Sequence, residues 1–240
     1  NSVAVAMDML TNHAAKLRFM SGGQTAVPLT IRTCTGAGIS TAGQHADYLE
    51  AWFAHTAGLK VVTFSSPAEA AGLLLSCIFD DDPCIFIENF LGYSSKGSAP
   101  VPGQRIPLGV ANVLRPGSDA TVITYGPQVA QAQLAAEKLA GEGVSVEIID
   151  LRTISPWDRQ TVLNSVAKTR RAVISHEAVR QFGVGAEIAS VIQEELFGQL
   201  AAPVLRVGAP SCPVPYSRPL ELAFMPDALD IEAALRRTLG

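Results

Sequence analysis

Three short stretches of almost continuous apolar residues stand out in the first half of the chain. They are Val27–Arg32, Lys60–Phe64 and Cys84–Glu88. A strand covered on one face alternates apolar and polar residues, whereas a strand buried on both faces is apolar throughout. The pattern therefore predicts three buried strands of a parallel sheet.

A helix start lies between the second and third of these strands. Ser66 is suited to cap a helix, Pro67 to its first position, and Glu69 would complete a capping box. Residues 70–79 are then nearly all apolar, as in a buried helix. Strand, crossover helix and strand in this order predict a right-handed βαβ unit.

The character of the chain changes after residue 90. Residues 90–105 are rich in Gly, Ser and Pro without periodicity, which predicts a linker or long surface loop. A second alternation of strands and helices follows and predicts a separate α/β domain. We expect domains at 1–92 and 118–240, joined by a linker at 93–117. The expected strands of the second domain are 120–125, 144–149, 172–175 and 204–207, and the expected helices are 126–140, one starting at Ser155–Asp158, 184–196 and one from about Asp227.

Composition and charge limit the classes of partner and the compartment that fit this chain. A net charge of −4 argues against nucleic acid or an anionic membrane as the main partner. No apolar run approaches the length of a membrane span, and no signal peptide is recognisable. The four cysteines lack metal-ligand spacing, so zinc is not expected, and a reducing cytoplasm or organelle matrix fits them best.

The candidate chemistry begins at His45. It follows a stretch with Gly36, Gly38 and Gly43, whose backbone can approach a ligand closely. An imidazole presented there can exchange a proton near neutral pH. The alternative is that His45 only bridges two loop carbonyls, and Asp47 is either its charge partner or a helix cap.

Several phrases of the chain carry a resemblance to a known family. They include Met20-Ser21-Gly22-Gly23, Gln44-His45, Gly58-Leu59-Lys60-Val61-Val62, Ile149-Asp150-Leu151-Arg152-Thr153-Ile154 and Ile174-Ser175-His176-Glu177-Ala178. In this order they resemble the β subunits of thiamine-diphosphate-dependent 2-oxoacid dehydrogenases, of the pyruvate, branched-chain and acetoin types. The resemblance implies an α/β fold: a partial transketolase-like pyrimidine-binding domain, then a transketolase C-terminal-like domain with a mostly parallel sheet.

The resemblance also implies an activity and partners. A subunit of this kind decarboxylates a 2-oxo acid and passes the acyl group to a lipoyl carrier, and His45 matches the histidine that serves proton transfer or charge stabilisation in that step. The Gly-Asp-Gly motif that holds Mg²⁺ and the diphosphate is absent, so an α-type partner is expected to supply them. A lipoyl acyltransferase core is the further expected partner.

Two features at the front of the chain depart from the family. Ser2 stands where relatives carry an aromatic residue that packs on the cofactor's pyrimidine, and it is a weak candidate for cofactor binding. The family's glutamate for the pyrimidine lies upstream of Asn1. Because Asn1 already stands within a helical pattern, we expect a processed or trimmed end, or a separate chain that supplies the missing part.

The resemblance further implies a structural potassium ion. Its ligands would be Leu29, Thr30, Cys77, Asp80 and Asp82, mainly through backbone carbonyls. From the residues alone, Asp80-Asp81-Asp82-Pro83 is a turn with three carboxylates that either binds a cation or is simply solvated.

Other histidines and glycines are expected to be structural. His55 would end a short helix, and His176-Glu177 would serve at an interface or behind the site. Gly183-Val184-Gly185 is too short for a dinucleotide fingerprint and predicts close packing instead. Two alternatives to the leading function stay open: a transketolase-like transfer of a carbon fragment, and a truncated, non-catalytic partner subunit.

Overall fold

The computed structural model describes residues 2–240, and Asn1 lies outside the described residues. The chain divides into two compact units. The first consists of Asn1–Val110 with Arg152–Trp157 and Pro213–Glu221, and the second of Ala111–Leu151, Asp158–Cys212 and Leu222–Gly240. The limits 1–92, 93–117 and 118–240 stay a prediction. Each compact unit consists of several segments that are separate in sequence, so the units do not test where a domain begins or ends along the chain.

The first unit is built on a four-stranded sheet of order β1-β3-β2-β7. The strands are β1 (Thr30–Thr35), β2 (Lys60–Thr63), β3 (Cys84–Asn89) and β7 (Thr153–Ser155). β3 pairs in parallel with both β1 and β2, whereas β7 is antiparallel to β2. β1 begins three residues later than predicted, and the other two predicted strands lie where the apolar pattern placed them.

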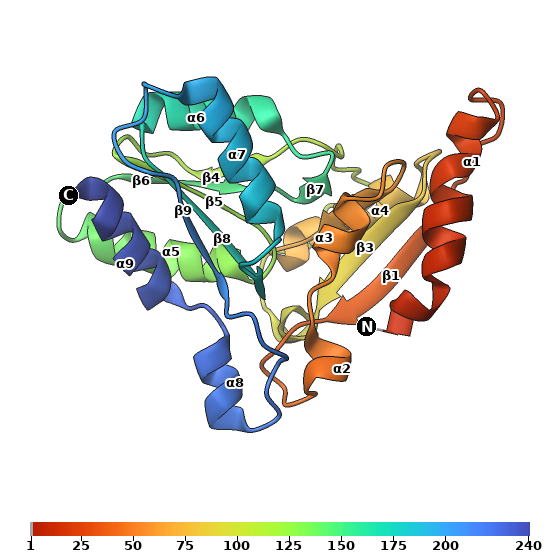
Figure 1. Ribbon diagram of the computed structural model, residues 1–240, viewed down its shortest axis with the longest axis horizontal. Helices are drawn as coiled ribbons and strands as arrows, with labels where there is room; N and C mark the ends of the chain where they lie inside the picture. Colours follow the sequence, from red (N-terminus) through yellow and green to blue (C-terminus); the bar gives the residue numbers. More distant parts are fainter. Residues whose placement is uncertain (1) are drawn as a thin grey trace. The chain divides into compact units, whose positions relative to one another are not determined.

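Helix α4 (Pro67–Ile78) connects β2 to β3 and packs against both strands (Figure 1). Its core is shared with the sheet, and its fully buried members include Leu73, Cys77, Val62 and Phe86. The parallel β2-α4-β3 unit confirms the prediction from the apolar runs. The predicted capping box is wrong, because the Ser66 side chain caps nothing and Glu69 instead forms an ion pair with Arg152.

The remaining elements of the first unit are short. The chain opens with the 3₁₀ helix η1 (Ser2–Ala6), the π-helix η2 (Met9–Ala14) and α1 (Ala15–Met20). α2 (Gly43–Ala46) and α3 (Glu50–Ala54) lie between β1 and β2, and η3 (Phe90–Ser94) follows β3. Residues 95–111 contain no helix or strand. Within them, Ile106 is buried against α4.

The second unit contains a five-stranded sheet of order β4-β6-β5-β8-β9. All neighbours are parallel except β4 against β6. The strands are β4 (Asn112–Arg115), β5 (Ala120–Thr124), β6 (Val146–Asp150), β8 (Ala172–Val179) and β9 (Leu205–Ala209). The mostly parallel α/β architecture of both units confirms the predicted fold class.

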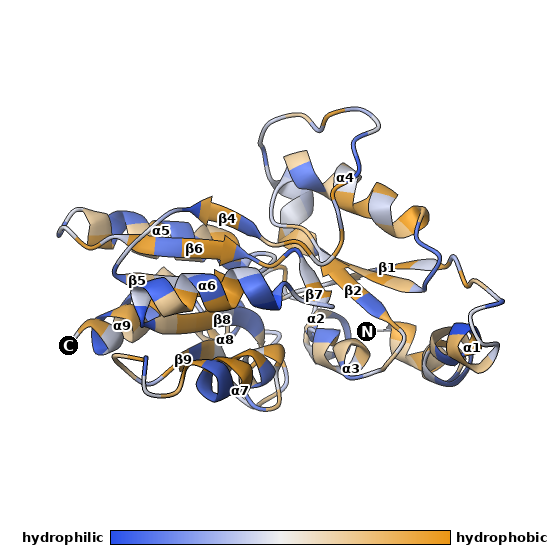
Figure 2. Ribbon diagram, turned by 90° about the horizontal axis from the view of Figure 1, so that it is seen from above, coloured by the Kyte–Doolittle hydropathy of each residue, from blue (hydrophilic) through white to orange (hydrophobic). Residues whose placement is uncertain are grey.

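Helices cover both faces of this second sheet. α5 (Gln128–Ala140) and α9 (Ala228–Leu239) pack together on one face, and α6 (Arg159–Thr169) and α7 (Val184–Leu196) pack together on the other (Figure 1). Hydrophilic and hydrophobic residues mix along α5 and α7 (Figure 2), as expected of helices with one buried side. The central strands β5, β6 and β8 are therefore buried on both faces.

One predicted helix start in this unit is wrong. Ser155 is the last residue of β7, where it pairs with Val61 of β2, and does not cap a helix. α6 begins at Arg159, and Asp158 caps it by accepting a hydrogen bond from the Thr161 N–H at 3.0 Å. Ser155 followed by Pro156 has the residue types of a helix N-terminus, but Ser155 forms part of β7 instead.

Candidate functional site

His45 lies on the short helix α2 with its side chain exposed. Its backbone N–H donates to the Ala42 carbonyl at 3.2 Å. Among residues 2–240 the imidazole has no hydrogen-bond or ionic partner. It therefore neither bridges two loop carbonyls nor pairs with Asp47, and both ring nitrogens are open to a reactant.

The loop before His45 is held in an unusual conformation. Gly36 and Gly38 have φ values of 112° and 110°, and the non-glycine residues Ser40 and Ala42 have φ values of 57° and 61°. A non-glycine residue in the left-handed region costs about 1–2 kcal/mol. Two such residues within three positions mean that surrounding contacts must fix the loop.

Contacts with the end of β3 fix the first part of this loop. A Cβ atom on Gly36 would stand 2.3 Å from the Asn89 side chain, and one on Gly38 would stand 2.8 Å from Leu91. Asn89 is itself immobilised, since it donates to the Tyr48 hydroxyl at 2.9 Å and accepts from the Leu91 N–H at 2.8 Å. Gly36 and Gly38 are therefore required for close approach to these two side chains of the chain itself, whereas their approach to a ligand stays a prediction.

Glu221 fixes the second part from a segment 180 residues away. It belongs to helix α8 (Arg218–Phe224), and its fully buried carboxylate accepts from the N–H groups of Gly38 at 2.7 Å and Ser40 at 3.0 Å. Arg218 pairs with the same carboxylate at 3.3 Å and donates to the Gly38 carbonyl. Burial alone would raise the pKa of Glu221, but these two N–H groups and the Arg218 guanidinium hold it below its usual range.

No motif pointed to Glu221 or Arg218. Their role depends on a contact between two segments far apart in sequence, and neither the spacing nor the residue types around them differ from those of an ordinary amphipathic helix. Asp47, in contrast, was singled out, but it ends α2 rather than capping a helix start, and its carbonyl accepts from the Thr35 hydroxyl at 2.6 Å.

Ser2 lies on η1 and is exposed. A short hydroxyl cannot provide the stacking surface that an aromatic ring offers to a pyrimidine. In this chain, Ser2 does not fit the role of the aromatic residue that it replaces.

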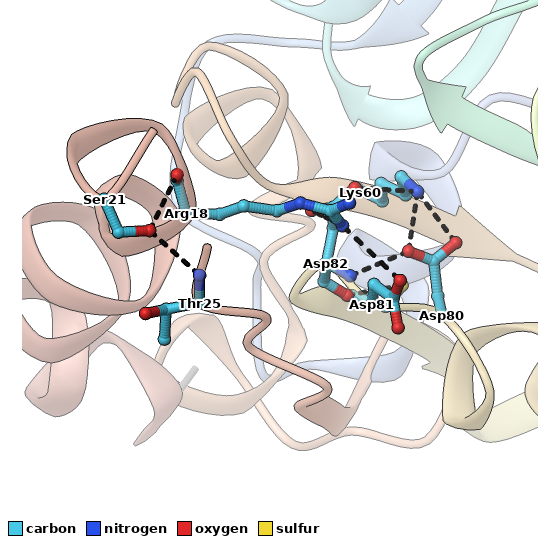
Figure 3. Close-up of polar contacts among 8 residues, drawn as sticks. Arg18, Ser21, Thr25, Lys60, Asp80, Asp81 and Asp82 are labelled. Atoms are coloured by element: carbon cyan, nitrogen blue, oxygen red, sulfur yellow. Dashed lines mark hydrogen bonds and ion pairs between the residues drawn. The ribbon is translucent and has the colours of Figure 1, made fainter. Parts of the chain in front are cut away.

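The aspartates after α4 form a network with two cations (Figure 3). The Lys60 ammonium lies 2.6 Å from Asp80 and 3.2 Å from Asp82, and Arg18 contacts Asp82 at 2.9 Å. Burial opposes the charge of Asp82, but Lys60 and Arg18 hold its pKa below the usual range. For Lys60, the two carboxylates outweigh burial and raise its pKa. These carboxylates are therefore neutralised within the chain and are not simply solvated.

Backbone groups of the predicted potassium ligands lie beside this network. The Leu29 carbonyl accepts from the Cys84 N–H at 2.8 Å, and the Cys77 carbonyl accepts from the Asp80 N–H at 3.2 Å, which leaves each a second lone pair. The Thr30 hydroxyl is buried without a hydrogen-bond partner. A buried hydroxyl that lacks a hydrogen-bond partner fits a cation that prefers oxygen ligands.

No cluster of three or more His, Cys, Asp or Glu side chains in residues 2–240 is arranged to hold a metal ion. No helix among these residues is both long and apolar enough to cross a membrane.

His176 is fully buried in the second unit. Its Nδ1 lies 3.0 Å from the Ala178 carbonyl, its ring stacks near Tyr125, and its Nε2 has no hydrogen-bond partner. Burial lowers its pKa to about 4. A Cβ on Gly183 or Gly185 would stand 2.7 or 2.9 Å from the His176 ring, which confirms close packing as the reason for these glycines. A ring sealed in this way is not presented at an interface.

His55 ends α3 as predicted.

Comparisons with known proteins agree with the fold. The transketolase pyrimidine-binding domain model matches residues 5–93, and the transketolase C-terminal domain model matches residues 109–231. Among solved structures, a split-gene transketolase described as an inactive β4 tetramer has a TM-score of 0.74 and 22% identity, and the match covers 98% of this chain and 73% of that one. At this identity the likeness shows the fold alone. The chain thus has the two-domain architecture of transketolase-type proteins.

Two relatives define the family more closely. The β subunit of the acetoin:2,6-dichlorophenolindophenol oxidoreductase of Cupriavidus necator is 42% identical, over 99% of this chain and 70% of its own length. The β subunit of the pyruvate dehydrogenase E1 component of Bacillus subtilis is 41% identical, over 97% of this chain and 72% of its own. The chain belongs to this family of β subunits of thiamine-diphosphate-dependent 2-oxoacid dehydrogenases.

Proposed function

We propose that this chain acts with an α-type subunit to decarboxylate a 2-oxo acid and to transfer the acyl group to a lipoyl carrier. The observation that carries the proposal is His45, an exposed imidazole without an intramolecular partner on a loop whose backbone is fixed at several points. An imidazole titrates near neutral pH and can hold or deliver a proton during acyl transfer.

The cofactor would be shared between two chains. Thiamine diphosphate would supply the carbanion chemistry, and its reaction centre would face His45. The α-type partner would hold the diphosphate and Mg²⁺, which is supported by the lack of a Gly-Asp-Gly motif in this sequence. A lipoyl acyltransferase core is the proposed acceptor. We place the chain in the cytoplasm or an organelle matrix, and one rice relative is named as mitochondrial.

A structural potassium ion is proposed between β1 and the turn after α4. Thr30 would contribute its hydroxyl, and Leu29, Cys77, Asp80 and Asp82 would contribute mainly backbone carbonyls. The buried and unpartnered Thr30 hydroxyl supports this site. Because Lys60 already neutralises Asp80 and Asp82, carbonyl and hydroxyl oxygens would provide most of the coordination.

One observation favours a second candidate, a non-catalytic partner subunit. Ser2 is exposed and offers no aromatic ring to the pyrimidine. Such a subunit would complete an assembly without turning over a 2-oxo acid.

The test is reconstitution with candidate α-type subunits, followed by measurement of CO₂ release from 2-oxo acids and of lipoyl acylation. We expect both activities, and we expect His45→Ala to lower lipoyl acylation about 100-fold, in the range of a lost general acid–base group. His55→Ala, an exposed histidine at a helix end, is the matched control and should retain activity. An assembly that binds the cofactor without releasing CO₂ would favour the non-catalytic subunit.

A further inference from the structure

A carboxylate from the C-terminal part of the chain enters the loop before His45. We propose that Glu221, together with Arg218, is a positioning residue that sets the geometry of this loop and thereby of the His45 imidazole. This inference rests on the function proposed above and adds to it a part of the site that is remote in sequence.

The contacts of Glu221 converge on the strained part of the loop. Its Oε1 accepts from the Gly38 N–H at 2.7 Å and from the Ser40 N–H at 3.0 Å, and its Oε2 is 3.4 Å from the Ser40 hydroxyl. Arg218 contacts both the carboxylate and the loop, since it pairs with Glu221 and donates to the Gly38 carbonyl. The side chain therefore links helix α8 to two alternate peptide groups of the loop.

Two N–H groups that point at one spot form a concave site for an anion. Here the chain fills that site with its own carboxylate, which is fully buried. The buried charge is balanced by charge-assisted hydrogen bonds and by Arg218, so the arrangement is stable only while all partners are in place. The depressed pKa of Glu221 agrees with an ionised carboxylate.

Only a few residues separate the anchored part of the loop from His45. Ser40 and Ala42 both have positive φ, and the Ala42 carbonyl accepts from the N–H groups of His45 at 3.2 Å and Ala46 at 3.1 Å. If Ser40 were released, Ala42 could relax to a less strained conformation and the first turn of α2 would move with it. A displacement of about 1 Å at a reacting group can cost about 100-fold in rate.

The first experiment needs no cofactor. Hydrogen–deuterium exchange of the peptide covering residues 36–45 is compared in the unmodified chain, Glu221→Ala and Glu221→Gln. We expect at least about tenfold faster exchange in Glu221→Ala, and a smaller increase in Glu221→Gln, because a glutamine oxygen still accepts but carries no charge. Unchanged exchange in Glu221→Ala would overturn the proposal.

A matched control is Glu232→Gln. Glu232 is also nearly buried and pairs with two cations, Lys138 and Arg236, but it lies on α9 and has no contact with the loop. Its variant should leave exchange of residues 36–45 unchanged. Equal acceleration in both variants would show a general loss of stability and would also overturn the proposal.

The second experiment separates positioning from general stability with a double-mutant cycle in the reconstituted complex. We expect Glu221→Ala to lower kcat for lipoyl acylation about tenfold with little change in KM, and to have no further effect in a His45→Ala background. Glu221→Gln should recover part of the rate. Multiplicative effects of the two substitutions would refute a role through His45.

The two hypotheses fail differently. If the unmodified chain shows no 2-oxo acid decarboxylation with any α-type partner, the proposed function is wrong. The exchange experiment then still shows whether Glu221 holds the loop before His45. If activity is present and Glu221→Ala exchanges and turns over like the unmodified chain, only the positioning role is wrong.

Discussion

His176 is a buried imidazole whose charge state contributes to stability. It is fully buried, and burial lowers its pKa from the ordinary 6.5 to about 4. The unfolded chain therefore binds more protons between these pH values, so unfolding becomes easier as the pH falls. The contribution of the neutral ring is fully present above about pH 6.5 and is lost as the pH approaches 4.

This pH dependence can be measured on the isolated chain. At about 1.4 kcal/mol per pKa unit, His176 should account for about 3 kcal/mol of the decrease in unfolding free energy between pH 6.5 and pH 4. We expect His176→Gln to have a flatter profile over this range in urea titrations. His55→Gln, which removes an exposed histidine, should keep the slope of the unmodified chain; equal slopes in all three proteins would contradict the assignment.

The Thr30 hydroxyl leads to a test of the potassium site. A bound ion stabilises the folded chain by mass action. We expect 100-fold excess K⁺ over its dissociation constant to raise Tm by about 5–10 °C relative to choline chloride at equal ionic strength. Thr30→Val should lose this shift. Thr25→Val changes an exposed threonine five positions earlier, of which only the backbone N–H forms a hydrogen bond, and should keep the shift. A K⁺ effect that is the same in all three proteins would contradict the site.

At the scale of elements, the turn from α3 into β2 depends on one glycine. Gly58 has a φ of 99°, and a Cβ there would stand 1.9 Å from the Ala15 carbonyl oxygen, which is backbone and cannot turn away. Lys16 strengthens the same contact by donating to the Ala57 carbonyl at 2.8 Å. The position of the N-terminal helix against this turn therefore requires glycine.

We expect Gly58→Ala to lower the free energy of unfolding by about 3 kcal/mol or more, because a main-chain clash adds to the conformational penalty. Gly143→Ala is the control: Gly143 also has a positive φ, 86°, but its Cβ would meet nothing within 4 Å. That substitution should cost only about 1–2 kcal/mol. Equal losses in denaturant titrations would show that the clash at Gly58 is relieved.

The elements also show where sequence patterns are sufficient. The strands β2, β3, β5 and β6 and the helices α4 and α7 were predicted within a few residues, because a strand buried on both faces and a helix between caps each leave a local pattern. The Ser155 helix start and the Ser66–Glu69 capping box were predicted wrongly. In both cases a tertiary contact replaces the local one. Ser155 pairs with β2 through its backbone, and the Glu69 carboxylate pairs with Arg152.

For the whole molecule, the proposed division of the cofactor between two chains makes a direct prediction. This chain alone should bind thiamine diphosphate weakly or not at all in calorimetry, because the sequence lacks the Gly-Asp-Gly motif that holds Mg²⁺ and the diphosphate in the family. A mixture with a suitable α-type subunit should bind it, with affinity lost when Mg²⁺ is chelated. Tight, Mg²⁺-dependent binding by the isolated chain would refute the division.

The sequence by itself determined the α/β class and the family and singled out His45 as a candidate, because these depend on local hydrophobic periodicity and on motifs whose residues are adjacent in the chain. Only the tertiary structure decided what holds His45 in place and how the aspartates are neutralised. Glu221 meets Gly38 across 183 residues, and Lys60 meets Asp80 across 20. Such contacts depend on how the chain returns to the same sheet, and short-range sequence patterns carry no information about that return.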